Sequence, residues 1–260
     1  MIITTGDNEA SGTVSRAAAL SQELGVPYVP RSRTSLSKLI SRHQADAVLV
    51  ILERGIRIVS AEGEPLEFHP SMSFVRAKRL MRGEPDHMLE VSRAKRGDSI
   101  IDCTSGLGSD SIIFSLAVGE EGSVTALESS LPIYGLLKEG LTTYQSGLKE
   151  FDKAMRHIEV KHADHLQLLG KLPDKSMDIV YFDPMFREPV KESSSISPLR
   201  TFANGSPLDS RSIEEACRVA RKTVVLKEKR DSGEFARLGF TVHERAHTKI
   251  AYGVITLDNR

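Results

Sequence analysis

The stretch Asp102-Cys103-Thr104-Ser105-Gly106-Leu107-Gly108-Ser109-Asp110 decides how this chain of 260 residues folds. A short apolar run, residues 99–103, leads into it, and a helical pattern over 110–118 follows it. Gly106 and Gly108 permit positive φ and let the backbone approach a ligand closely. A glycine-rich turn between a buried strand and a helix is typical of nucleotide-binding α/β proteins.

Outward from this turn, strand-like and helical segments alternate along the sequence. Further strands are expected at 123–127, 158–161, 177–182 and 223–226, with helices at 110–118, 131–144, 164–169 and 212–221 and extended segments at 241–244 and 251–257. This alternation predicts a doubly wound, mainly parallel sheet that binds ligands at the carboxyl ends of its strands.

The part of the chain before the turn has a different character. Residues 1–68 contain a strand at 2–5, helices at 14–24 and 36–43, and a hairpin formed by 47–52 and 56–60. A basic helical segment follows at 74–82, and a second helix is expected at 87–95. We therefore expect a small α/β appendage over residues 1–68 and a main domain over residues 69–260.

The acidic residues of the turn indicate which cofactor it binds. Glu128 ends the next strand, 20 residues after Gly108, where a carboxylate can accept both hydroxyls of a ribose. Dinucleotide-binding turns carry a third glycine where this chain has Ser111. Asp102 and Asp110 would repel a pyrophosphate but suit a cation, which favours S-adenosyl-L-methionine over NAD. The alternative is a tight turn with no ligand; Asp164 could likewise accept from adenine or only cap a helix.

A second motif, Asp183-Pro184-Met185-Phe186, follows the strand expected at 177–182, at the same edge of the sheet. An exocyclic amine of a base is a poor nucleophile because its lone pair is delocalised into the ring. The Asp183 carboxylate and the Pro184 carbonyl can each accept an N–H, and the Phe186 ring can stack on the base. The motif therefore indicates methyl transfer to an amine, although a strand end with an Asp cap and a Pro breaker would look alike.

Together these residues resemble class I S-adenosylmethionine-dependent methyltransferases. More narrowly, they resemble the methyltransferase J family, which methylates guanine N2 in small-subunit ribosomal RNA, through four motifs: the turn 102–110, Leu127-Glu128, 183–186, and Lys222-Thr223-Val224-Val225-Leu226-Lys227. The resemblance covers roughly residues 68–257. The chain departs from the family after the motif 183–186, called the acceptor motif below, because Arg187-Glu188-Pro189-Val190-Lys191 and a Ser-rich stretch follow it here.

The resemblance implies a Rossmann-like sheet of seven strands whose last strand is antiparallel. It also implies which residues surround the cofactor: Ser109, Asp110, Glu128, Ser129, Asp164, His165 and Asp183. The expected activity is that of an RNA (guanine-N2) methyltransferase. The alternatives are a methyltransferase acting on an amine of DNA, protein or a small molecule, a non-catalytic RNA-binding module, and an NAD-dependent oxidoreductase.

Composition and charge limit the remaining choices. The formal net charge is zero, so any RNA-binding surface must be local. Residues 74–96 carry seven basic and three acidic residues, which could contact phosphates or form only a solvated helix face. No metal-ligand spacing and no long apolar run is present, so we expect no metal, no membrane span and a cytoplasmic protein whose Cys103 and Cys217 are reduced. The oligomeric state stays open.

Overall fold

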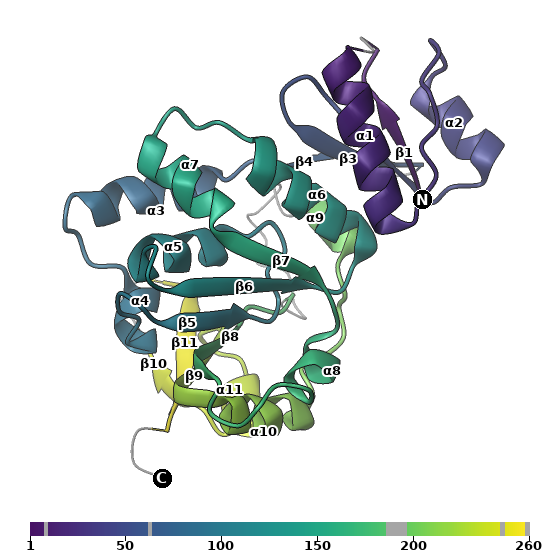
Figure 1. Cartoon of the computed structure of the whole chain (residues 1–260). Coiled ribbons are helices and arrows are strands. Elements are labelled where there is room, and N and C mark those ends of the chain that lie inside the picture. The colour runs from purple at the N-terminus through teal and green to yellow at the C-terminus, as the bar shows by residue number, and fades with distance from the viewer. Residues whose placement is uncertain (8–9, 62–63, 186–196, 245–247, 258–260) are drawn as a thin grey trace.

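The computed structural model describes residues 1–7, 10–61, 64–185, 197–244 and 248–257 (Figure 1). Two sheets organise these residues, one of four strands near the N-terminus and one of seven strands. The larger sheet comprises β5 (Ser99–Asp102), β6 (Ser123–Glu128), β7 (Ile158–His162), β8 (Met177–Phe182), β9 (Ala220–Lys229), β10 (Thr241–His243) and β11 (Ile250–Thr256).

The strand order of the larger sheet is β10-β11-β9-β8-β5-β6-β7. Strands β7, β6, β5, β8 and β9 run parallel, and β11 is antiparallel to both β9 and β10. This confirms the predicted doubly wound sheet of seven strands with an antiparallel last strand. The order also places β5 between β6 and β8, so the turn after β5, Glu128 and Asp183 meet at one edge.

Helices cover both faces of this sheet (Figure 1). One face carries α3 (Ser71–Met81), α4 (His87–Ser92), α5 (Ser109–Val118), α6 (Leu131–Thr143) and α7 (Lys149–Arg156). The other carries α8 (His165–Leu169), α10 (Ser210–Val219) and α11 (Glu234–Arg237). Alternate side chains of β8 pack against the two layers, since Tyr181 lies in the first core and Phe182 in the second.

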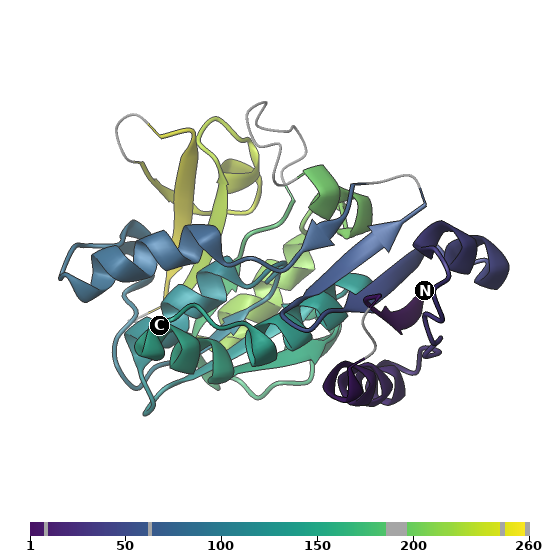
Figure 2. The same ribbon diagram turned by 90° about the horizontal axis from the view of Figure 1, so that it is seen from above.

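The smaller sheet consists of β1 (Ile2–Thr5), β2 (Ala47–Ile51), β3 (Ile56–Ser60) and β4 (Leu66–Glu67), with α1 (Ser11–Leu24) and α2 (Leu36–His43). It packs against α6, as both views show (Figures 1 and 2). Two glycines of α6 permit this approach: a Cβ atom on Gly135 would lie 2.7 Å from Leu49, and one on Gly140 would lie 2.1 Å from the Phe68 ring.

Several element boundaries differ from the sequence-based expectation. The helix expected over 87–95 ends at Ser92, because Arg93 adopts a left-handed conformation with φ 60°. Strand β9 is longer than the expected 223–226. Four short elements were not predicted: β4, α7, α9 (Ser197–Phe202) and α11. No helix in the described parts of the chain is both long and apolar enough to cross a membrane.

Candidate active site

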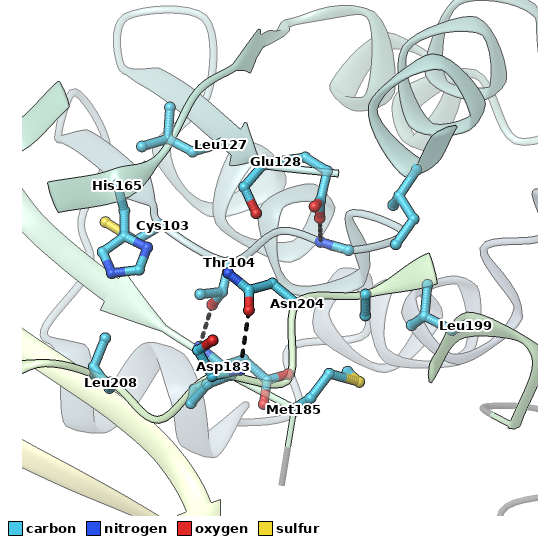
Figure 3. Close-up of a pocket in the computed structure, with 16 residues that line it drawn as sticks. Cys103, Thr104, Leu127, Glu128, His165, Asp183, Met185, Leu199, Asn204 and Leu208 are labelled. Atoms are coloured by element: carbon cyan, nitrogen blue, oxygen red, sulfur yellow. Dashed lines mark hydrogen bonds between the residues drawn. The ribbon is translucent and has the colours of Figure 1, made fainter. Parts of the chain in front are cut away.

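A pocket opens at the carboxyl ends of β5, β6 and β8, where the sequence predicted a ligand site (Figure 3). Its walls come from the turn after β5, the end of β6, the start of α8, the acceptor motif after β8, and the segment 199–208. The lining residues are Cys103, Thr104, Gly106, Leu127, Glu128, Ser129, Ile133, His165, Asp183, Pro184, Met185, Leu199, Ala203, Asn204, Ser206 and Leu208.

The glycine-rich turn is held by backbone hydrogen bonds to neighbouring strands. The N–H of Ser105 donates to the carbonyl of Leu127 at 3.0 Å. Gly106 and Gly108 both have positive φ, 52° and 75°. A Cβ atom on Gly108 would lie 2.8 Å from Leu137 of α6, so this position needs glycine for its conformation and for packing. The turn is thereby fixed against β6 and α6.

Glu128 closes β6 with both carboxylate oxygens directed at backbone donors. Oε2 accepts from the N–H of Gly106 at 3.1 Å, and Oε1 accepts from the N–H of Ser130 at 2.8 Å. Burial raises the pKa of this carboxyl, and these backbone N–H groups oppose the rise. Glu128 thus connects the turn after β5 to the end of β6 through these hydrogen bonds, and it lines the pocket (Figure 3).

Asp102 lies beneath the turn rather than on the pocket wall. It accepts from the hydroxyl of Ser111 at 2.5 Å and from the N–H of Thr104 at 3.2 Å. Ser111 therefore occupies the place of a third glycine and binds the carboxylate that opens the turn. Burial raises the pKa of Asp102 to about 7, and the hydrogen bond from Ser111 opposes the rise.

Asp110, at the first turn of α5, is surrounded by cations. Its oxygens accept from Arg76 at 2.5 Å, from Lys227 at 2.9 Å and from the hydroxyl of Tyr181 at 2.7 Å. Burial alone would raise the pKa of Asp110, but Lys227 and Arg76 hold it well below its usual value. The expectation that the charges of Asp102 and Asp110 face a cationic ligand is therefore corrected, because neither residue lines the pocket and Asp110 is paired with two cations.

Asp183 follows β8 directly and lies across the pocket from Glu128, with Thr104 between them (Figure 3). Its N–H donates to the Thr104 hydroxyl at 2.5 Å, and its carboxylate accepts from Lys227 at 2.8 Å. Burial raises the pKa of Asp183 to about 6, although Lys227 lowers it. Pro184 and Met185 also line the pocket, whereas Phe186 and the stretch 187–191 lie outside the described residues.

Of the other residues that the sequence assigned to the cofactor, some line the pocket and some do not. Ser129 and His165 line the pocket. Nε2 of His165 lies 3.1 Å from the Ser212 hydroxyl, and burial lowers the pKa of the imidazole. Asp164 caps α8 by accepting from the N–H of Gln167 at 3.0 Å. Gly108, Ser109 and Asp164 are not on the pocket wall, and their roles at the cofactor stay predictions.

Sequence reasoning missed the segment that closes the pocket on one side. Leu199 belongs to α9, and Ala203, Asn204, Ser206 and Leu208 follow it. No local motif marks these residues, because only the return of the chain after β8 brings them to the pocket. Thr104 could have been found, since it stands inside the turn and has a hydroxyl. Among the described residues, no group of three His, Cys, Asp or Glu side chains could hold a metal ion.

Several proteins described as methyltransferases are similar to this chain. A family model described as "Putative SAM-dependent methyltransferase" matches residues 35–248. An uncharacterised Bacillus subtilis protein named YpiP is 42% identical over 254 residues, covering 98% of each chain. Ribosomal RNA small subunit methyltransferase J of Thioalkalivibrio sulfidiphilus is 27% identical and covers 82% of each chain, while other proteins of that name align over about half their length.

The fold also has a close counterpart among solved structures. The crystal structure of a SAM-dependent methyltransferase from Neisseria gonorrhoeae superposes with a TM-score of 0.66. The alignment covers 100% of this chain and 97% of that one, at 16% sequence identity.

Proposed function

The chain belongs to this family of S-adenosylmethionine-dependent methyltransferases, and we propose that it methylates the exocyclic N2 amine of a guanine in ribosomal RNA. One observation carries the proposal: Asp183 and Pro184 share a pocket with Glu128 and the glycine-rich turn. An amine held by the first pair would therefore lie beside a cofactor held by the second. The relatives named ribosomal RNA small subunit methyltransferase J support RNA as the acceptor.

The residues present fit S-adenosylmethionine. Glu128 presents its carboxylate to the pocket. Each of its oxygens accepts one of the backbone N–H groups described above, so a lone pair is left to accept a ribose hydroxyl. Gly106 lets the backbone approach the ligand, and Ser129 and His165 would lie around the adenosine. When bound, the cofactor supplies an electrophilic methyl group attached to a cationic sulfur.

The acceptor motif would orient the amine and stabilise its developing charge. The Asp183 carboxylate and the Pro184 carbonyl would each accept one N–H, which turns the nitrogen lone pair toward the methyl group. No strong base is required, because the amine loses its proton easily once it has gained positive charge. Asp183 would then act chiefly by electrostatics. Stacking by Phe186 remains part of the proposal.

The basic segment near residue 78 would position the RNA. Lys78 and Arg79 of α3 and Arg82 at its C-cap are exposed, where phosphates could reach them, and Arg79 also pairs with the exposed Glu84 at 2.7 Å. Arg76, from the same basic stretch, and Lys227 of β9 have partners inside the fold. Arg76 pairs with Asp86 and Asp110 on the inner side of α3, and Lys227 pairs with Asp110 and Asp183 beside the pocket. Fewer basic side chains are therefore available to contact RNA than the number of basic residues in the sequence suggests.

The decisive experiment compares modified nucleosides in ribosomal RNA from cells with and without this protein. We expect N2-methylguanosine to be reduced in the small-subunit RNA of the deletion strain. The wild-type chain should restore it, while Asp183→Ala should lower methyl transfer at least about 100-fold. Binding of S-adenosylhomocysteine, measured by calorimetry, should persist in Asp183→Ala. Unchanged N2-methylguanosine after deletion would refute the RNA assignment and leave another amine as the acceptor.

A further inference from the structure

A half-buried ion network joins Asp183 of the acceptor motif to β9 and α5. The ammonium of Lys227 is 2.8 Å from Oδ2 of Asp183 and 2.9 Å from Oδ2 of Asp110. The Lys227 side chain is 22% exposed and that of Asp110 only 5%, so water screens these contacts little. One cation therefore bridges the carboxylate of the acceptor motif and a carboxylate of α5.

The position of this ammonium is set by groups other than Asp183. Asp110 pairs with this ammonium and also accepts hydrogen bonds from Arg76 and from the hydroxyl of Tyr181. Arg76 also donates from Nε to Asp86, the N-cap of α4, at 2.8 Å. Groups from α3, α4, α5 and β8 thus converge to hold the Lys227 side chain of β9. A substrate amine cannot easily draw Asp183 away from a cation anchored in this way.

We propose that Lys227 is a positioning residue for methyl transfer: it fixes the Asp183 carboxylate and keeps it ionised to receive the acceptor amine. This inference rests on the proposed role of Asp183. A carboxylate can accept an N–H and stabilise a positive amine. A protonated carboxyl carries an O–H donor and no charge. Protonation of Asp183 would therefore weaken its acceptance of the amine N–H and remove the stabilisation of the positive amine.

The charges around Asp183 explain why a cation is needed. Asp110 of α5, Asp102 of β5 and Glu228 of β9 face it with like charge, and the hydroxyls of Tyr181 and Tyr252 lie nearby. Arg76 compensates Asp110. Burial and Asp110 both raise the pKa of Asp183, and Lys227 opposes them, leaving it at about 6. Without Lys227 the pKa should rise by about one unit or more, toward or above neutral pH.

The chain provides a matched control on the same strand. Lys222, at the opposite end of β9 from the pocket, pairs with Asp98 at 2.5 Å and with Asp178 at 3.5 Å. Lys222→Met removes a half-buried, doubly paired lysine as Lys227→Met does, but leaves the acceptor motif untouched. A purely structural role for Lys227 would make the two variants behave alike.

The first measurement requires no RNA. Carbon-13 NMR of the aspartate carboxyls, with Asp183 assigned through Asp183→Asn, follows its titration in each variant. The midpoint of Asp183 should lie about one pH unit or more above wild type in Lys227→Met and at the wild-type value in Lys222→Met. An unchanged midpoint in Lys227→Met would overturn the proposal. If that variant does not fold, Asp110→Asn with Lys227→Met removes one anion together with the cation, and its Asp183 midpoint should still exceed wild type.

The second measurement follows the rate of methyl transfer to small-subunit ribosomal RNA against pH. For Lys227→Met, kcat at pH 7 should fall about twofold if the Asp183 midpoint rises by one unit and about tenfold if it rises by two, and it should recover as the pH rises, while Lys227→Arg keeps the wild-type acidic limb. A loss that is equal at every pH would contradict the ionisation argument. If wild type transfers no methyl group to this RNA, the proposed function fails, and the NMR titration still decides the role of Lys227.

Discussion

At the scale of single residues, Glu128 connects the fold to the cofactor. Its two oxygens accept from Gly106 and Ser130, so the same carboxylate that faces the pocket also holds the turn in place. Glu128→Gln replaces one acceptor by an N–H₂ group that must face a backbone donor or the ligand. We expect S-adenosylhomocysteine to bind about 10–100-fold more weakly, as measured by calorimetry.

Glu159→Gln is the matched control for this prediction, because Glu159 is exposed on β7 and pairs only with Lys161 among the ion pairs described. Its affinity for S-adenosylhomocysteine should equal that of wild type. If Glu128→Gln also binds with wild-type affinity, Glu128 does not hold the cofactor.

Sequence reasoning brought together the residues whose position follows from a strand end, since Glu128 and Asp183 line the same pocket. Glu128 ends β6 and Asp183 follows β8, on either side of β5 in the parallel part of the sheet, and residues at such strand ends meet at one edge. It failed for the charge of Asp110, because compensation comes from Arg76 and Lys227, which stand 34 and 117 residues away in the sequence. Local patterns name ionisable groups, but only the folded chain determines their partners.

At the scale of elements, helix α6 joins the two sheets through its glycines. Gly140→Ala should improve helix propensity by about 1 kcal/mol. The added Cβ would lie 2.1 Å from the Phe68 ring, however, which is buried and packed edge-on against Tyr144. We expect the clash to prevail, with a net loss of about 1–3 kcal/mol in the free energy of unfolding, measured by urea denaturation.

Gly12→Ala tests the same substitution where space is free. Gly12 lies in the first turn of α1, and an added Cβ would meet nothing within 4 Å. This variant should be as stable as wild type or slightly more stable. Equal stability of Gly12→Ala and Gly140→Ala would mean that the small sheet can move away from α6 at little cost.

The elements themselves were predictable where the hydrophobic pattern is continuous. β8 has the predicted bounds, Met177–Phe182, because its run of apolar residues is buried on both faces. The helix α7 was missed because only Phe151, Ala154 and Met155 of its eight residues are buried, which is too short a pattern to distinguish from a loop. The end of α4 depends on the left-handed Arg93, a choice that non-glycine residues seldom make.

At the scale of the whole molecule, the two sheets share one hydrophobic core. A single cluster of buried side chains includes Ile3, Leu49 and Phe68 from the N-terminal part together with Ile100 and Phe114 from the cofactor-binding part. The division into a small appendage over residues 1–68 and a main domain stays a prediction, and this cluster of buried side chains has members from both parts. Bracing of the core by the small sheet is the role that the packing favours for it.

A shared core predicts that the chain unfolds in one cooperative step. Leu49→Ala in β2 and Ile179→Ala in β8 each empty a fully buried site and should each lower the free energy of unfolding by about 2–5 kcal/mol. Scanning calorimetry should show a single transition shifted down in both variants and shifted up by S-adenosylhomocysteine. Met72→Ala is the control, because Met72 is 69% exposed and should leave the transition unchanged. If Leu49→Ala instead creates a separate early transition and spares the one that the ligand stabilises, the small sheet unfolds on its own and does not brace the site.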